Sequence, residues 1–181
     1  MGYNDDMLDL RFPTALQVML SLALAEREGV RSLSSAQLAA GVGVNASFVR
    51  KLLVPLAQKG LVASSEGKNG GVRLGRPAKT ITLREIYGAV TGDKELWIPR
   101  QDVPHRCLVS SNVNSFFERL AAEATECVLA LLATRTLHDS LVELENIAEA
   151  PAPNRRRRVA RKPEAQSKMK PHFPLATEAR R

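Results

Sequence analysis

Basic side chains gather in one short segment of the chain, between Arg50 and Arg84. This segment holds eight Lys and Arg residues but a single acidic residue, Glu66. The basic residues are Arg50, Lys51, Lys59, Lys68, Arg73, Arg76, Lys79 and Arg84. Such local clustering is typical of a protein surface that faces the phosphates of a nucleic acid.

The overall charge of the chain is a weaker indication, because it lies in the C-terminal tail. Residues 150–181 hold ten basic residues against Glu164 and Glu178, a net charge of +8, so residues 1–149 carry a net charge of −1 although the whole chain carries +7. The basic run at 155–158 and its flanking prolines predict a disordered tail. A nonspecific nucleic-acid-binding structural protein that acts through this tail is one alternative, and its binding would fall steeply with salt.

The two cysteines are candidates for redox chemistry rather than for a structural site. Cys107 and Cys127 are too few for a disulfide scaffold, and their separation matches no common zinc spacing. His105 and Arg106 precede Cys107, and nearby positive charge lowers the pKa of a thiol, so Cys107 is a candidate sensor, with a cysteine of no special role as the alternative. Cys127 is interpreted as a small core residue, or as a second redox residue that bridges two subunits.

No pattern in the sequence indicates an enzyme. The three histidines, His105, His138 and His172, lie far apart, and no catalytic triad, phosphate-binding glycine loop or metal motif is evident. We therefore expect no catalytic residues, no metal and no cofactor. The longest apolar run, residues 16–25, is too short to span a membrane, and the acidic N-terminus lacks the features of a secretory signal, which predicts a cytoplasmic protein.

Three helices are predicted to position the first part of the basic segment. Apolar residues at three- and four-residue spacing indicate a helix over 13–28, with Leu24 on its buried face. Ser34 and Gln37 fit a capping box for a short second helix, and Asn45 caps a third helix in which Pro55 is expected to cause a kink or a tightened turn. The third helix turns Phe48, Val49, Leu52, Leu53 and Leu56 inward and presents Ser47, Arg50, Lys51 and Val54 on its outer face.

A glycine-tipped hairpin is predicted to follow, with strands over 61–65 and 72–74 and a turn over 68–71. Thr82 opens a short helix, and residues 92–112 are expected to be irregular. A long helix begins at Val113, with apolar residues four and three apart, which is the spacing of a helix that packs against another helix. A last short helix is expected over 136–144.

Together these elements predict a winged helix-turn-helix, in which one helix enters the major groove of DNA and the hairpin, or wing, lies along an adjacent strand. Arg50 and Lys51 can contact guanine and Asn45 adenine, and we expect Arg50 and Arg73 to share one surface. Asn45 as a mere helix cap and Phe48 as a mere core residue remain open alternatives. The candidate DNA-binding residues are Ser35, Asn45, Ser47, Phe48, Arg50, Lys51, Lys68, Asn69, Gly70, Gly71 and Arg73.

Several segments resemble the Rrf2 family of bacterial transcription regulators. They are LRFPTALQVML (10–20), VNASFVRKL (44–52), KGLV (59–62), GKNGGVRLGR (67–76) and ITLREI (81–86), within a resemblance that covers residues 8–145. The resemblance implies a homodimer that is held by the long C-terminal helix and acts, usually as a repressor, on partly palindromic operators. It also implies DNA contacts by Ser47, Phe48 and Arg50 and by the wing residues Gly70, Gly71 and Arg73, whose glycines would take positive φ.

The cysteine pattern departs from the cluster-binding members of this family. Those members resemble one another in having three cysteines in the loop before the long helix, whereas this loop has only Cys107. Iron-sulfur binding is therefore disfavoured, and the chain resembles the cluster-free branch, in which a single loop cysteine responds to oxidants or electrophiles. A small-molecule ligand in a pocket between the DNA-reading domain and Trp97 is a further alternative.

The sequence thus predicts a mainly α-helical protein with a small β-hairpin. Residues 1–92 form the winged helix-turn-helix, 93–112 a sensor loop, 113–148 the dimerisation helices and 149–181 the disordered basic tail. We expect a homodimeric regulator of transcription whose operator binding is modulated at Cys107. Its expected partners are double-stranded DNA and a small-molecule or oxidant effector, and no membrane.

Overall fold

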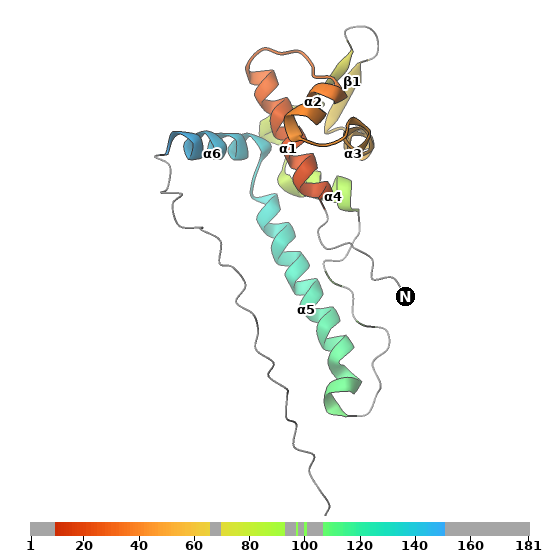
Figure 1. The fold of residues 1–181 in the computed structure, drawn as a ribbon. Coiled ribbons are helices and arrows are strands. Elements are labelled where there is room, and N and C mark those ends of the chain that lie inside the picture. The colour runs from red at the N-terminus through yellow and green to blue at the C-terminus, as the bar shows by residue number, and fades with distance from the viewer. Residues whose placement is uncertain (1–9, 66–69, 93–96, 98–99, 101–106, 151–181) are drawn as a thin grey trace, which may run out of the picture. The chain divides into compact units, whose positions relative to one another are not determined.

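The computed structural model describes residues 10–65, 70–92, 97, 100 and 107–150. The chain divides into two units, residues 1–149 and 150–181, and nearly all of the described residues belong to the first. This first unit is mainly helical with one antiparallel hairpin, as the sequence predicts (Figure 1). Its elements are α1 (Arg11–Arg27), α2 (Ser35–Val42), α3 (Ala46–Gln58), β1 (Val62–Ser65), β2 (Gly71–Leu74), the 3-10 helix η1 (Ala78–Thr80), α4 (Leu83–Thr91), α5 (Leu108–Ala133) and α6 (Leu137–Glu149).

The predicted helix caps are present at the starts of α2 and α3. Ser34 and Gln37 form a complete capping box, in which the Ser34 N–H donates to Gln37 Oε1 at 2.8 Å and the Gln37 N–H donates to Ser34 Oγ at 3.2 Å. Gly43, in the left-handed region at φ 74°, ends α2 and turns the chain toward Asn45. The helix α3 that follows continues through Pro55 without a break in its α-helical assignment.

One hydrophobic core joins α1, α3, the hairpin, α4 and the start of α6. The inward residues of α3 are buried as predicted, except Phe48, which is half-buried. In α1 the buried face is centred on Ala15, Val18 and Leu22, so Leu24, which was expected to be buried, is 36% exposed. The largest fully buried side chains are Met19, Leu38, Leu56, Leu61, Ile81, Ile86 and Leu137.

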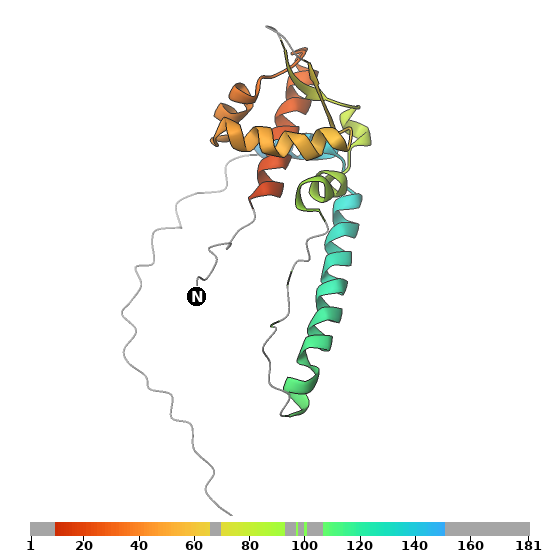
Figure 2. The same cartoon turned by 90° about the vertical axis from the view of Figure 1, so that its right-hand side faces the viewer.

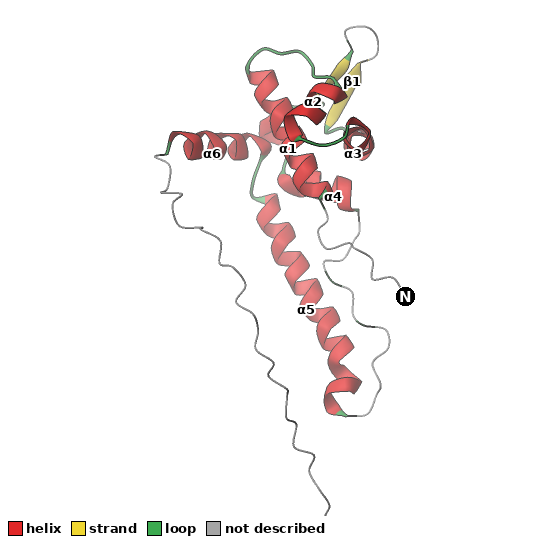
Figure 3. Ribbon diagram, in the orientation of Figure 1, coloured by secondary structure: helices red, strands yellow, loops and turns green. Residues whose placement is uncertain are grey.

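Backbone hydrogen bonds from Val72 of β2 hold the hairpin to the loop between α1 and α2. In its antiparallel register Val62 pairs with Leu74 and Ser64 with Val72. Leu33 then forms an isolated bridge to Val72, in which the two residues exchange N–H to C=O bonds of 2.9 and 2.8 Å. Figure 3 shows the two strands in yellow, with the connection from α1 to α2 in green.

The long helix α5 begins five residues before the predicted start, Val113, because Cys107 serves as its N-cap. The irregular segment that was predicted over 92–112 is therefore shorter than expected. At its other end, α5 is connected to α6 through a segment that is bonded to the start of α4: the Leu83 N–H donates to Arg135 O at 2.9 Å and the Leu137 N–H to Ile81 O at 2.8 Å. Figure 2 shows α4, in green, beside this end of α5. Helix α6 extends to Glu149, beyond the expected end at Leu144.

Within the described part of the chain, every helix is too short or too polar to cross a membrane.

The fold predicts opposite changes in the free energy of unfolding for two glycine-to-alanine substitutions. A Cβ at Gly75 would overlap the carbonyl oxygen of Gly60, and this contact involves backbone that cannot swing away, whereas a Cβ at Gly88, in α4, meets no atom within 4 Å. We expect Gly75→Ala to lower the free energy of unfolding by about 1–3 kcal/mol and Gly88→Ala to raise it by about 0.5–1 kcal/mol. Urea unfolding followed by circular dichroism measures both, and a Gly75→Ala protein as stable as Gly88→Ala would contradict the close approach.

Candidate nucleic-acid interface

The outer face of α3 carries the side chains that the sequence placed there. Ser47, Arg50, Lys51 and Val54 are all exposed, and Val54 keeps 56% of its surface accessible. Their spacing of three, four and seven residues puts them on one side of the helix. The opposite side is buried in the core, so this is the face that α3 offers to a partner.

A groove of about 500 Å³ separates this face of α3 from the hairpin. Arg50, Val54 and Ala57 form its α3 side, and Ser64 and Ser65 belong to its hairpin side. The remaining lining residues are Ser34, Ser35, Leu53, Gly70, Gly71 and Val72. The groove is thus lined by hydroxyl groups, one guanidinium group and a strip of apolar surface, which suits a partner with both anionic and apolar parts.

Arg50 and Ser35 meet at one end of the groove. Arg50 Nη1 donates to Ser35 Oγ at 3.4 Å, a long hydrogen bond between two side chains that come from α3 and α2. The bond directs the guanidinium group toward the start of α2. The structure therefore brings together two of the predicted DNA-binding residues that are fifteen positions apart in the sequence.

Asn45 and Phe48 have structural roles in the chain. Asn45 Oδ1 accepts a hydrogen bond from the Ser47 N–H at 2.8 Å and so caps α3, although the residue itself is exposed. Phe48 is half-buried and packs against the core. These are the roles that the sequence had left open beside DNA contact.

Arg73 is exposed, but it does not line the groove that contains Arg50. Its neighbours in β2, Val72 and Leu74, are buried, and successive side chains of a strand point to opposite faces. Arg73 therefore points away from the side on which Val72 and Leu74 are buried, and its Nη1 donates to Leu74 O at 3.3 Å. Arg50 and Arg73 thus line different hollows of the surface, and the expectation that they share one DNA-facing surface stays a prediction. Lys68 and Asn69 lie outside the described residues.

Gly71 is needed for packing inside the protein, which the sequence analysis missed. It belongs to β2 and does not take the positive φ that was expected. A Cβ at this position would lie 2.8 Å from Ser32 Oγ and 3.1 Å from Leu33 O. The glycine therefore lets the hairpin approach the connection between α1 and α2, and this approach positions one wall of the groove.

Arg76 belongs to the basic segment but is engaged in an internal ion pair. Its Nη2 donates to Glu85 Oε1 at 2.5 Å, and its Nη1 donates to Thr80 O at 3.1 Å. Burial alone would raise the pKa of Glu85, but hydrogen bonds from Thr82 and Arg76 outweigh it and lower this pKa. Arg76 thus connects the end of the hairpin to α4 and is a structural cation.

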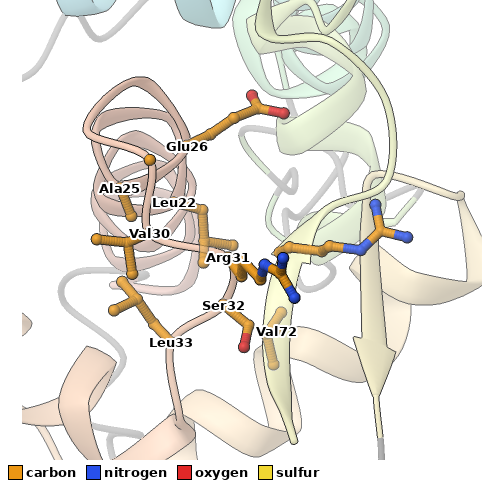
Figure 4. A pocket seen from close by; sticks show the side chains of 10 residues that line it. Leu22, Ala25, Glu26, Val30, Arg31, Ser32, Leu33 and Val72 are labelled. Atoms are coloured by element: carbon orange, nitrogen blue, oxygen red, sulfur yellow. The ribbon is translucent and has the colours of Figure 1, made fainter.

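A second cavity, of about 270 Å³, lies behind the hairpin and was not predicted from the sequence. Its walls come from the end of α1, the following loop and β2, and Figure 4 shows Arg31 directed toward β2 with Leu22, Val30 and Leu33 nearby. The ligand pocket that the sequence leaves open as an alternative would lie elsewhere, beside Trp97. Trp97 itself packs against Phe117 of α5, with ring centroids 6.2 Å apart.

Cys107 is exposed and caps α5 with its sulfur atom. The Ser110 N–H donates to Cys107 Sγ at 3.5 Å, and the Ser110 hydroxyl lies 3.4 Å from the same atom. Hydrogen bonds from the Ser110 side chain, and then from the N–H groups of Ser110 and Val109, lower the pKa of the thiol. The sequence predicted this direction from His105 and Arg106, which lie outside the described residues; the helix start supplies a different cause.

The two cysteines do not fit an iron-sulfur cluster within one chain. Cys127 is exposed on α5, and the helical rise puts it about 30 Å from Cys107 along the axis. The interpretation of Cys127 as a small core residue concerns the seam of this helix, which only a second helix would cover, and it stays a prediction. Among the described residues, no three His, Cys, Asp or Glu side chains gather in a way that could hold a metal ion.

Comparison with known proteins identifies relatives that regulate transcription. The Rrf2 family model, which describes an iron-dependent transcriptional regulator, matches residues 8–143. The HTH-type transcriptional regulator IscR of Cereibacter sphaeroides is 34% identical over 76 residues, which are 42% of this chain and 49% of that protein. IscR of Xenorhabdus nematophila is 37% identical over 76 residues, 42% of this chain and 45% of that protein. The chain thus spans about half the length of these relatives.

Solved structures show the same fold. IscR of T. potens superimposes with a TM-score of 0.59 at 22% identity, covering 83% of this chain and 97% of that one. CymR of B. subtilis, the global cysteine regulator, gives a TM-score of 0.52 at 24% identity, covering 75% of this chain and 96% of that one. Both have the winged helix-turn-helix arrangement that residues 10–149 show here.

The family match covers α1 to α6 up to residue 143, including the outer face of α3, the groove and the hairpin. The chain therefore belongs to the Rrf2 family, whose model describes an iron-dependent transcriptional regulator.

Proposed function

We propose that the protein is a homodimeric repressor that binds a partly palindromic operator through α3 and the hairpin. The observation that carries the proposal is the exposed outer face of α3, which borders the groove with Arg50 and adjoins Lys51. A recognition helix of this kind contacts base edges, while cations at its sides and on a wing contact phosphates. The proposal places the protein in the cytoplasm, where the operator DNA would be.

Arg73, an exposed cation of the hairpin, supports this proposal. A wing that lies along the minor groove is flanked by phosphates on both sides, so its two faces do not need to form one surface with α3. We assign Arg50 to the DNA beside the recognition helix and Arg73 to a separate contact made by the wing. Lys51, Ser47 and Ser35 complete the set that we propose for the described residues.

An apolar stripe on α5 supports the homodimer. Val109, Val113, Phe116, Leu120, Ala124, Cys127 and Leu131 recur at spacings of four and three along one side of the helix. Phe116, Leu120 and Leu131 are 57%, 43% and 57% exposed, whereas Ala121, on another side of α5, is buried. Trp97 and Arg100 contact the same side of the helix as Ala121, through Trp97 on Phe117 and an Asn114 Nδ2 to Arg100 O bond of 3.1 Å. A second copy of the stripe is the partner that its heptad-like spacing fits.

Cys107 is the residue that we propose as the sensor, in a protein of the cluster-free branch. Peroxide would transfer one oxygen atom to the thiolate, giving sulfenic acid and water after protonation. The modified sulfur is a different cap for α5, and Val109, the first residue of the stripe, is two positions away. Modification would therefore change the end of the dimer interface and, through it, the spacing of the two DNA-reading domains.

The first prediction concerns the phosphate contacts. Operator DNA is obtained by selection from random-sequence duplexes with the full-length protein. Arg50→Ala and Arg73→Ala should each weaken binding to this DNA roughly tenfold to a hundredfold at low salt. Affinity falls as salt rises, and each variant should make this fall less steep, by about 0.9 in the slope of log affinity against log salt for one lost phosphate contact. Fluorescence anisotropy over a salt series measures both quantities.

Arg84→Ala is the matched control for these variants, because Arg84 is an exposed cation of α4 that does not line the groove. It should leave affinity and slope nearly unchanged. If all three variants lose affinity equally, net charge rather than the proposed surface determines binding.

The second prediction concerns the dimer. Leu120→Lys places a charge in the middle of the stripe and should convert the protein to a monomer with weakened operator binding, because an unpaired charge would be buried at the interface. Ala122→Lys introduces the same charge on an exposed position of α5 away from the stripe and should remain dimeric. Sedimentation equilibrium measures the mass of each, and a wild-type monomer at micromolar concentration would refute the homodimer.

The third prediction concerns Cys107. Mild peroxide should change the operator affinity of the wild type and of Cys127→Ser, reversibly with dithiothreitol, but not that of Cys107→Ser. Ser110→Ala removes a hydroxyl that lowers the pKa of Cys107, so the pH at which iodoacetamide alkylates this thiol at half its maximal rate should move upward. Gel shifts and alkylation rates are the measurements; equal affinity of wild type and Cys107→Ser before and after peroxide excludes the switch.

A further inference from the structure

Val54 is an apolar side chain in the middle of the polar outer face of α3. Val54 and Ser47 lie on the same side of α3, because at 3.6 residues per turn the two side chains point within about 20° of each other around the helix axis. Arg50 lies about 40° to one side of Val54 and Lys51 about 60° to the other. An exposed isopropyl group therefore stands between two cations, 56% accessible to solvent.

The core does not account for this side chain. Val49, Leu52, Leu53 and Leu56 complete the buried face of α3, and Val54 is on the other side of the helix. Val54 instead borders the groove, together with Arg50 and Ala57. A β-branched residue is also a weaker helix former than alanine, so the exposed position has no evident advantage for the helix itself.

The position of Val54 relates it to the base edges of bound DNA. Cations at the sides of a recognition helix neutralise the phosphates that border the major groove, and the residues between them face the floor of that groove. Val54 has no hydrogen-bonding group, so it can distinguish base pairs only by apolar contact. In the major groove, the one apolar group that a base pair presents is the C5-methyl group of thymine.

We propose that Val54 recognises the C5-methyl group of a thymine in the operator. The inference rests on the proposed function, because it requires that α3 enter the major groove. The flanking charges favour DNA over a second copy of the same face, since Arg50 and Lys51 would meet their like charges in such a pair. Val54 is thus a specificity residue, whereas the contacts of Arg50 with phosphate are blind to sequence.

The test removes the methyl group from each partner in turn. Duplexes are first selected from a random-sequence pool with the full-length protein, and each thymine of the selected site is then replaced singly by deoxyuridine, which lacks only the C5-methyl group. Wild-type protein should bind about fourfold more weakly when deoxyuridine replaces one particular thymine of each half-site. This ratio corresponds to ~0.8 kcal/mol, the free energy of burying one methyl-sized group. Val54→Ala should lose a similar factor on the unmodified duplex and should be insensitive to deoxyuridine at that thymine.

Val142→Ala is the matched control, because it makes the same truncation at an exposed position of α6, where Val142 is 38% accessible. It should respond to every deoxyuridine as the wild type does. The inference is overturned if Val54→Ala retains the wild-type response at every thymine, or if the selected site contains no thymine whose methyl group matters. A selection that enriches no sequence contradicts the proposed function itself. This result differs from one in which a sequence is enriched but Val54→Ala responds to deoxyuridine as the wild type does, which contradicts only the role of Val54.

Discussion

The hairpin can border α3 only because two glycines of the hairpin region let its backbone approach neighbouring residues closely. Gly75 lies against the Gly60 carbonyl group and donates its N–H to Leu61 O at 2.9 Å, and Gly71 lies against the Ser32 side chain and the Leu33 carbonyl group. Larger residues would force the strands away from α3 and from the loop after α1. The width of the groove, and hence the placement of its hydroxyl groups opposite Arg50, depends on these two approaches.

Backbone hydrogen bonds at one junction connect α4, which shares a core with α3 and the hairpin, to the segment that follows α5. The bridge between Thr82 and Thr136 joins the start of α4 to the segment between α5 and α6, and Leu137 and Leu141 of α6 enter the same core as α1. Because α4 and α6 are packed into that core, pairing of α5 with a second copy would fix the position of each DNA-reading unit. Cys107 lies at the other end of α5, so its proposed influence has to pass through the dimer interface.

Local signals predicted much of this fold. The capping boxes at Ser34 and Thr82, the Asn45 cap and the inward face of α3 depend on residues within four positions of one another, which the sequence displays directly. The start of α5 was misplaced because cysteine is not a usual N-cap, although Ser110 completes the same box. Leu24 was assigned to the wrong face because α4, α6 and β2 all pack against α1, and their positions determine which of its side chains are buried.

The sequence by itself determined the class of the protein: the order of short helices and hairpin, the basic segment and the exposed residues of α3 follow from periodicity and composition. The tertiary structure alone decided which of those residues act together. It joined Arg50 to Ser35, placed Arg73 outside the groove that Arg50 lines, engaged Arg76 with Glu85 and gave Gly71 a packing role. The physical reason is that contacts between residues distant in the chain depend on how elements pack, and no local pattern records the distance or the face at which two elements meet.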